Sequence, residues 1–112
     1  MDVIAIEDLP FSRIAHELVG DDHGGIGISL LLVDAQPGDG PSLHQHAYPE
    51  VFIVQEGEAV FVAGGQERTV TAGEVVVVPP RTPHSFRATG DGPLRQIDIH
   101  INSHFETEWI SS

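Results

Sequence analysis

Three histidines and one glutamate in the middle of the chain have types and spacings that suit metal binding. His44 and His46 are two residues apart, so their imidazoles project from the same face of an extended chain and can close on one ion. Glu50 follows after a short loop, and His84 follows the proline-rich turn 79–83, which sets the entry of the next strand. Three nitrogens and one oxygen make a borderline-soft site. We therefore predict one divalent transition metal there (Fe, Mn, Ni, Cu, Co or Zn) rather than calcium.

Two of the residues in this region are candidates for catalysis. Glu50 is either the fourth ligand or a general base that stays beside the ion. The phenol of Tyr48 is a candidate donor to a metal-bound molecule, although aromatic packing at the rim of the site is the simpler interpretation. Phe52 and Phe86 share strand parity with Glu50 and His84, so we expect both rings to face the same cavity.

Two further polar residues have simpler interpretations than a role in the site. His100 shares an alternating polar face with Gln96 and Asp98, and we expect it to be exposed or at an interface rather than in the pocket. Arg81 lies in the turn before His84, where a solvated side chain is the plainer interpretation and an anion anchor the alternative.

The sequence pattern predicts that short strands position these residues. β-branched runs occupy 26–33, 51–54, 59–62, Val75–Val78 and 97–101, and segments rich in glycine and proline separate them. This pattern is typical of an all-β sandwich or barrel and gives no alternating helices for a parallel sheet. The Val75–Val78 run is apolar on both faces, which predicts either a central strand or a strand covered by a partner in a homodimer. Residues 12–19 fit a strand or a short helix.

The spacing of the candidate ligands resembles the two motifs of the cupin superfamily. The first motif, over 38–57, is met at Gly38, His44, His46, Glu50 and Gly57. The second, over 73–88, is met at Gly73, Pro79 and His84, with Arg81 at the usual glycine and Ala88 at the usual asparagine. The resemblance implies a small jelly-roll β-barrel, a double-stranded β-helix, that spans residues 1–112 as a single domain. It also implies dimerisation through edge strands.

Composition excludes several classes of partner and chemistry. Seventeen acidic residues against five arginines give a formal net charge of −12, which disfavours nucleic acid and anionic membranes. No apolar stretch is long enough to cross a membrane, and acidic residues near the N-terminus replace the basic start of a secretory signal, so we expect a cytoplasmic protein. The absence of cysteine removes disulfides, thiolate ligands and cysteine nucleophiles.

The expected function rests on the metal site and on the resemblance. A site with positions left open for a small-molecule substrate allows Lewis-acid or oxygen-activating chemistry. The resemblance implies dioxygenases first, and isomerases, cyclases or lyases as alternatives, acting on small oxygenated molecules. A non-catalytic module that binds a small molecule or a metal is the alternative from a different class.

Overall fold

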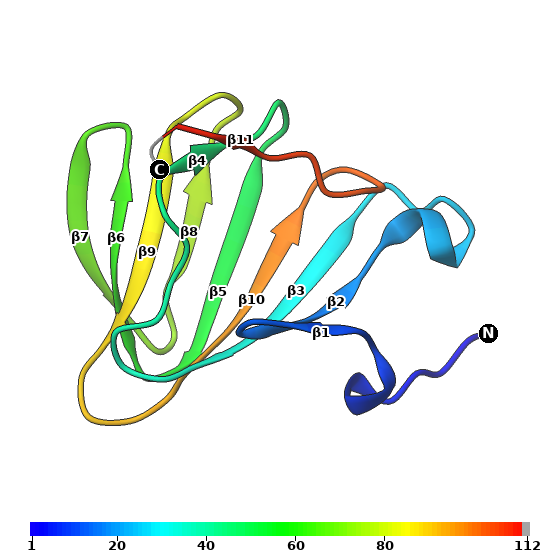
Figure 1. Cartoon of the computed structure of the whole chain (residues 1–112), viewed down its shortest axis with the longest axis horizontal. Helices are drawn as coiled ribbons and strands as arrows, with labels where there is room; N and C mark the ends of the chain where they lie inside the picture. The colour runs from blue at the N-terminus through cyan, green and yellow to red at the C-terminus, as the bar shows by residue number, and fades with distance from the viewer. Residues whose placement is uncertain (111–112) are drawn as a thin grey trace.

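The β-branched runs and turns form two antiparallel sheets that face each other, as the computed structural model of residues 1–110 shows (Figure 1). One sheet has the strand order β1-β2-β3-β10-β5-β8 and the other β11-β4-β9-β6-β7. The strands are β1 (Phe11–Ser12), β2 (Ala15–Leu18), β3 (Ser29–Ala35), β4 (His44–Gln45), β5 (Glu50–Glu56), β6 (Glu58–Ala63), β7 (Gln66–Thr71), β8 (Val75–Val78), β9 (His84–Thr89), β10 (Leu94–His100) and β11 (Glu108–Trp109). Two short 3-10 helices are η1 (Ile6–Asp8) and η2 (Gly20–His23).

The predicted all-β class is confirmed, and each of the five predicted runs overlaps a strand. The ambiguous segment 12–19 is strand, since β1 and β2 form a hairpin along the edge of the larger sheet. Strand β7 was not predicted from the sequence. It contains no apolar run, because Val70 is its one buried residue. Among residues 1–110, no helix has the length and apolarity needed to cross a membrane.

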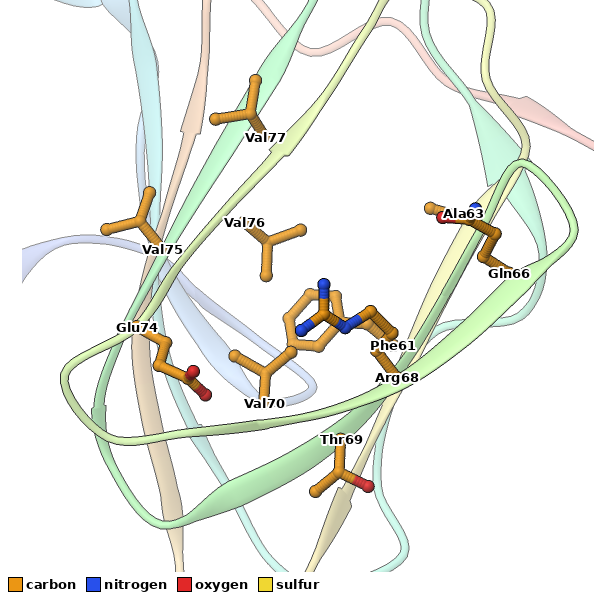
Figure 2. A pocket seen from close by; sticks show the side chains of 10 residues that line it. All are labelled: Phe61, Ala63, Gln66, Arg68, Thr69, Val70, Glu74, Val75, Val76 and Val77. Carbon is orange, nitrogen blue, oxygen red and sulfur yellow. The ribbon is translucent and has the colours of Figure 1, made fainter.

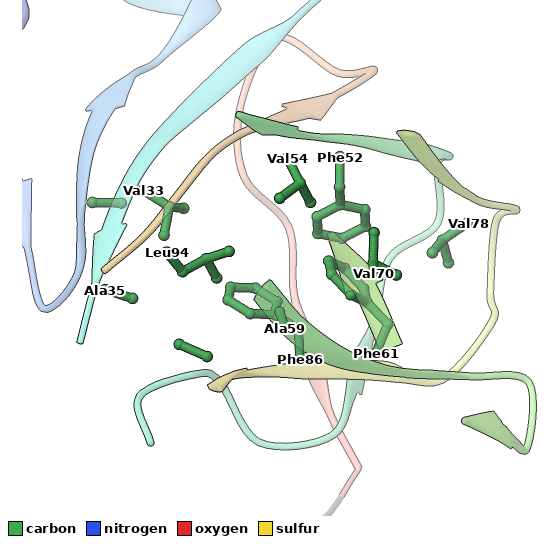
Figure 3. Close-up of a cluster of buried hydrophobic side chains, with 12 residues drawn as sticks. Val33, Ala35, Phe52, Val54, Ala59, Phe61, Val70, Val78, Phe86 and Leu94 are labelled. Atoms are coloured by element: carbon green, nitrogen blue, oxygen red, sulfur yellow. The ribbon is translucent and has the colours of Figure 1, made fainter. Parts of the chain in front are cut away.

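The core lies between the two sheets and is centred on three phenylalanines. Phe52 comes from the larger sheet, and Phe61 and Phe86 come from the smaller one. The rings of Phe52 and Phe61 are 5.1 Å apart edge to face, and those of Phe61 and Phe86 are stacked at 5.5 Å. Figure 3 shows these rings meeting from opposite ribbons. Such ring contacts, together with the burial of apolar area, stabilise the packing of the two sheets and set their relative orientation.

The outer face of the larger sheet is also apolar. Cross-strand register places two rows of apolar side chains there: Leu32, Ile97, Ile53 and Val75 in one row, and Leu30, Ile99, Val51 and Val77 in the other. Most of these side chains are half-buried by each other, while Val75 and Val77 are 58% and 66% exposed. The first alternative for Val75–Val78 is therefore wrong, because β8 is an edge strand and not a central one. The homodimer stays a prediction.

Candidate metal centre

The four predicted ligands come together at one end of the barrel. His44 begins β4, His84 begins β9, and these two residues are paired in register. His46 follows β4 directly, and Glu50 begins β5 on the opposite sheet. This is the end near the labels β4 and β11 in Figure 1. One possible ligand atom from each of the four buried residues lies within 4.8 Å of all the others.

Backbone carbonyls fix the orientation of the three imidazoles. The Nδ1 atoms of His44, His46 and His84 lie 2.7, 2.7 and 2.8 Å from the carbonyl oxygens of Ser42, Glu106 and Thr82. A carbonyl can only accept, so each Nδ1 carries the proton and donates it. Each Nε2 then carries a lone pair that can bind a metal, and one possible ligand atom of each imidazole lies within 4.8 Å of the others. This is the arrangement in which a second hydrogen bond holds a metal-binding histidine in position.

The carboxylate of Glu50 divides its two oxygens between different partners. Oε1 lies 3.1 Å from Nε2 of His46 and 3.2 Å from Nε2 of His84. Oε2 lies 3.1 Å from Nε2 of His100. Oε1 therefore faces the ligand cluster, and Oε2 faces away from it and contacts His100. This geometry suits a ligand that binds through one oxygen, and both roles predicted for Glu50, ligand and general base, stay predictions.

Two possible ligand atoms, Nε2 of His46 and Oε1 of Glu50, lie close together, and a metal ion between them would explain the short distance. With the proton on Nδ1, an Nε2 atom is an acceptor, and an acceptor only 3.1 Å from a carboxylate oxygen needs a cation between them. Within residues 1–110, Nε2 of His46 is buried without a hydrogen-bond partner, since its approach to Glu50 lacks hydrogen-bond geometry. Either an additional proton or a metal ion satisfies it. The residues present fit a divalent metal.

The electrostatics of the cluster favour a neutral His44 and an ionised Glu50, the states that bind metal, whereas they favour protonation of His46. Burial lowers the pKa of His44 to about 4, and the neighbouring imidazoles of His84 and His46 add to this, so His44 is neutral at neutral pH. Burial alone would raise the pKa of the Glu50 carboxyl, but the close imidazoles of His100, His46 and His84 outweigh burial and lower it. Burial opposes protonation of His46 as well, yet Glu50 and the Glu106 carbonyl raise its pKa above the ordinary value.

His100 lies inside the site, which corrects the expectation that it is exposed or at an interface. It is 3% exposed, contacts Glu50 through Nε2, and its Nδ1 lies 2.8 Å from the hydroxyl of Tyr48. The alternation of β10 is confirmed, but its two faces are the reverse of those expected. Gln96, Asp98 and His100 point inward with Leu94, and the isoleucines point outward. Of these inward polar side chains, His100 contacts the candidate ligand Glu50, and Gln96 contacts Asp98.

The hydroxyl of Tyr48 links the site to the C-terminal segment. It accepts a hydrogen bond from the backbone N–H of Glu106 at 3.1 Å and also contacts His100. Burial raises the pKa of Tyr48 to about 12, so the phenol stays protonated. Tyr48 is buried, and it is not among the residues that line the cavity beside the metal centre. Its predicted role as a donor to a bound molecule stays a prediction.

Residues 103–110 form a segment across the mouth of the site that sequence reasoning missed. Its β11 strand pairs with β4, its Phe105 ring lies 4.8 Å from His100, and its Trp109 ring lies 5.1 Å from His44. The Glu106 carbonyl orients His46. This contribution comes from a backbone atom, so no residue type in the segment signals it.

A cavity of about 680 Å³ lies beside the ligand cluster. Phe52 and Phe86 line it together with His44, His46 and Glu50, which confirms the parity argument for the two rings. Asp98 and His100 line it from β10, and the β1–β2 hairpin closes one side. The cavity combines apolar walls with a few convergent polar groups, as small-molecule sites do.

Arg81 has a backbone role at the turn before His84. Its φ is +57°, a left-handed conformation, and its N–H donates to the carbonyl of His46 at 2.7 Å. The cupin motif has a glycine at this position, and the positive φ is the physical reason. The turn therefore keeps the glycine conformation without the glycine, and the side chain is exposed.

A second cavity, of about 280 Å³, lies between β7 and β8 and carries no part of the centre (Figure 2). Its lining includes the apolar Phe61, Val70 and Val76 and the charged Arg68 and Glu74. It contains no histidine and none of the predicted ligands.

Known proteins share this fold and part of this sequence. The curated HTH-type transcriptional regulator PuuR of Escherichia coli is 28% identical over 93 residues, which cover 82% of this chain and 50% of the regulator. The chain spans about half the length of the curated relatives it matches. A cupin-like protein from Thermotoga maritima has 26% identity and a TM-score of 0.77, over 100% of this chain and 90% of that one.

An enzyme structure is also similar in fold. Oxalate decarboxylase from Bacillus subtilis, described for its Mn(II) centres, superposes with a TM-score of 0.78 at 24% identity, over 93% of this chain and 30% of the enzyme. The family model described as "Cupin domain" matches residues 31–100, which contain all four predicted ligands, most of β3 and all of β10. With the two motifs, the double-stranded β-helix architecture and the match over more than half its length, this chain belongs to the cupin family.

Proposed function

We propose that this cupin binds one divalent transition metal through His44, His46, Glu50 and His84, and that the metal acts on a small oxygenated organic molecule in the adjoining cavity. The observation that carries the proposal is that three buried imidazoles, each oriented by a carbonyl at Nδ1, and the Glu50 carboxylate bring one possible ligand atom each within 4.8 Å of one another. The set of three nitrogens and one oxygen favours Fe, Mn, Ni, Cu, Co or Zn over calcium.

When bound, the metal supplies Lewis-acid or redox chemistry. The protein supplies the rest. Phe52 and Phe86 give the bound molecule apolar walls that exclude water, and the C-terminal segment limits access from the mouth. Glu50 holds its position because His100 contacts the oxygen that faces away from the cluster. A monodentate carboxylate so placed can also accept a proton from the bound molecule.

Dioxygenase-type chemistry is our first choice, with isomerase, cyclase or lyase chemistry as alternatives. The similarity to the decarboxylase supports the fold, whereas the metal is argued from the residues of this chain. Mn(II) belongs in the first set of metals to test because that enzyme contains it.

A non-catalytic binding module is the second candidate. The similarity to about half of a protein named as a transcriptional regulator supports it. The two candidates differ in the fate of a bound ligand. Product formation or oxygen uptake with Fe(II), Mn(II) or Ni(II) supports the enzyme, and stoichiometric binding without product supports the module.

The first experiment is metal analysis of protein purified without an affinity tag. We expect close to one equivalent of metal per chain in the wild type and a large loss in His46→Ala. His23→Ala is the matched control, because His23 lies in η2 and belongs to neither the ligand cluster nor the cavity. Equal metal content in wild type and His46→Ala would refute the site.

We also propose that the chain forms a homodimer through the two apolar rows on the outer face of the larger sheet. A twofold dimer buries the same patch on both copies. Val77→Lys places a charge at the exposed end of one row and should weaken the dimer at least about tenfold, because a buried unpaired charge is costly. Thr69→Lys, exposed on the smaller sheet, is the control. A monomeric wild type in analytical ultracentrifugation would refute the proposal.

A further inference from the structure

The cavity beside the metal centre contains a buried acid that the ligand cluster does not use. Asp98 is 1% exposed and lines the cavity. The amide of Gln96 donates to its Oδ1 at 2.9 Å, and this is the one side-chain hydrogen bond that Asp98 makes within residues 1–110. Oδ2 is thus left for another partner. Gln96 is itself 1% exposed, and its Oε1 is buried without a partner among the described residues. Buried polar groups are normally satisfied, so this pair calls for an explanation.

The position of Asp98 places that free oxygen within reach of a molecule at the metal centre. Asp98 and His100 are two residues apart on β10 and share its inward face, so they are about 7 Å apart along the strand. His100 is paired with Glu50 in register, and Asp98 with Phe52. A molecule of about four carbons matches this strand spacing, so one end at the metal and its body against Phe52 would bring its other end to Asp98.

The charges around Asp98 indicate which chemical group the ligand carries at the end remote from the metal. Among the described residues, the one basic side chain of lysine or arginine type that lines the cavity is Arg13, which is exposed in the β1–β2 turn. Burial, and then the nearby Glu50 charge, raise the pKa of Asp98 well above its ordinary value. A carboxylate at this depth would lose its water without gaining a cation. A hydroxyl group can both donate to and accept from Asp98 at no such cost.

We propose that Asp98, held by Gln96, is the specificity-determining residue of the cavity and binds an uncharged hydroxyl group on the ligand, at the end remote from the metal. The proposal rests on the proposed function, which places the other end of the ligand at the metal. It names a substrate class: short, mainly apolar molecules with a metal-binding oxygen at one end and a hydroxyl at the other. Dicarboxylates are excluded from the preferred ligands.

Three four-carbon acids that differ at one end test the preference. Butanoate ends in a methyl group, 4-hydroxybutanoate in a hydroxyl and succinate in a second carboxylate. Zn(II)-loaded protein, with metal content measured on the same sample, is titrated with each acid by calorimetry. We expect 4-hydroxybutanoate to bind at least about fivefold more tightly than butanoate, the effect of one hydrogen bond, and at least about tenfold more tightly than succinate. Equal affinities, or no binding of any of the three acids, would overturn the proposal.

Variants separate recognition by Asp98 from effects on the fold. Asp98→Leu should abolish the preference for 4-hydroxybutanoate over butanoate, while Asp98→Asn, which keeps an acceptor for Gln96 and offers a donor, should retain it. Asp34→Leu makes the same change on the exposed side of β3 and should leave all three affinities unchanged. A preference that persists in Asp98→Leu would overturn the proposal.

The metal measurement distinguishes failure of the proposed function from failure of this inference. If the wild type binds less than one Zn(II) per chain, the proposed metal site fails. The three acids are then compared on metal-free protein, where a retained preference for the hydroxyl supports the role of Asp98 and its absence overturns it.

Discussion

Replacement of Tyr48 by phenylalanine tests whether the C-terminal segment and the metal centre are held by one hydroxyl group. The Tyr48 oxygen contacts Nδ1 of His100 at 2.8 Å and accepts from the N–H of Glu106 at 3.1 Å. The phenylalanine ring keeps the stacking on His46, whose ring centroid is 5.0 Å away. The substitution therefore removes hydrogen bonds without removing packing.

The expected loss depends on the partners left behind. Each net hydrogen bond contributes about 1 kcal/mol, and a buried donor or acceptor left without a partner costs about 1–3 kcal/mol. With one N–H and one imidazole nitrogen affected, we expect Tyr48→Phe to lower the free energy of unfolding by about 2–3 kcal/mol. Looser positioning of His100, and through it of Glu50, should weaken metal binding about tenfold, as is usual for partners of metal ligands.

Urea unfolding followed by circular dichroism measures the first quantity, and competition with a chelator measures the second. Thr89→Val is the matched control, because it removes a hydroxyl that donates to Glu58 at 2.9 Å at the other end of the barrel. We expect this control to lose less than about 1 kcal/mol and to bind metal normally. A Tyr48→Phe protein within about 0.5 kcal/mol of the wild type, with unchanged metal affinity, would refute the reasoning.

Three further predictions concern single positions. Arg81→Gly should raise the free energy of unfolding by about 1 kcal/mol, because glycine adopts the φ of +57° without strain, and an unchanged urea midpoint would contradict this. Gly57→Ala should lower the free energy of unfolding by at least about 2 kcal/mol, since φ is +84° and a Cβ would clash with the Pro93 carbonyl oxygen. Gly65→Ala, at φ +81° with no atom near the added Cβ, should lower it by only about 1 kcal/mol. Similar urea midpoints for the two variants would refute the clash. Asp98→Asn should gain stability relative to the wild type as pH rises above about 4, by at most about 1.4 kcal/mol per pH unit. The raised pKa of Asp98 means that only the unfolded wild type releases its proton in that window, which favours unfolding, and asparagine does not titrate. Unfolding at pH 4.5, 5.5 and 6.5 measures the difference between the two proteins, and a constant difference would contradict the burial of a neutral acid.

The ligand set could be predicted from the sequence because it depends on local spacing. His44 and His46 share a face in any extended chain, and the motif glycines mark turns that need a positive φ, as Gly57 does. Even Arg81, which departs from the motif, lies in the predicted turn. The contribution of the C-terminal segment could not be predicted in the same way, because Glu106 acts through its backbone carbonyl and N–H, which every residue type except proline provides in full.

The inward direction of β10 shows a limit of periodicity. Alternation states which residues share a face but not which face is inside, and the usual rule that apolar residues are buried selects the isoleucines. Two facts override that rule here. His100 contacts the candidate ligand Glu50 in the interior, and Ile97 and Ile99 lie in apolar rows on the outer surface of the sheet. A buried polar face combined with an apolar outer face fits a strand with a site on one side and, on the other, the apolar rows through which we propose a homodimer.

Both faces of β10 depend on a single register. Successive side chains alternate, so a shift of one residue would turn Ile97 and Ile99 into the cavity and Asp98 and His100 out of it. The pairing of β10 with β5 shifts between Arg95 and Gln96, so that Arg95 faces Glu56 and Gln96 faces Val54. This irregularity lies at the end of the pairing remote from the centre, and the register is continuous from Gln96 to His100, where Asp98 and His100 face the cavity. The bulge therefore absorbs the extra residue of β5 where no ligand is affected, and the pairs that position His100 against Glu50 stay in register.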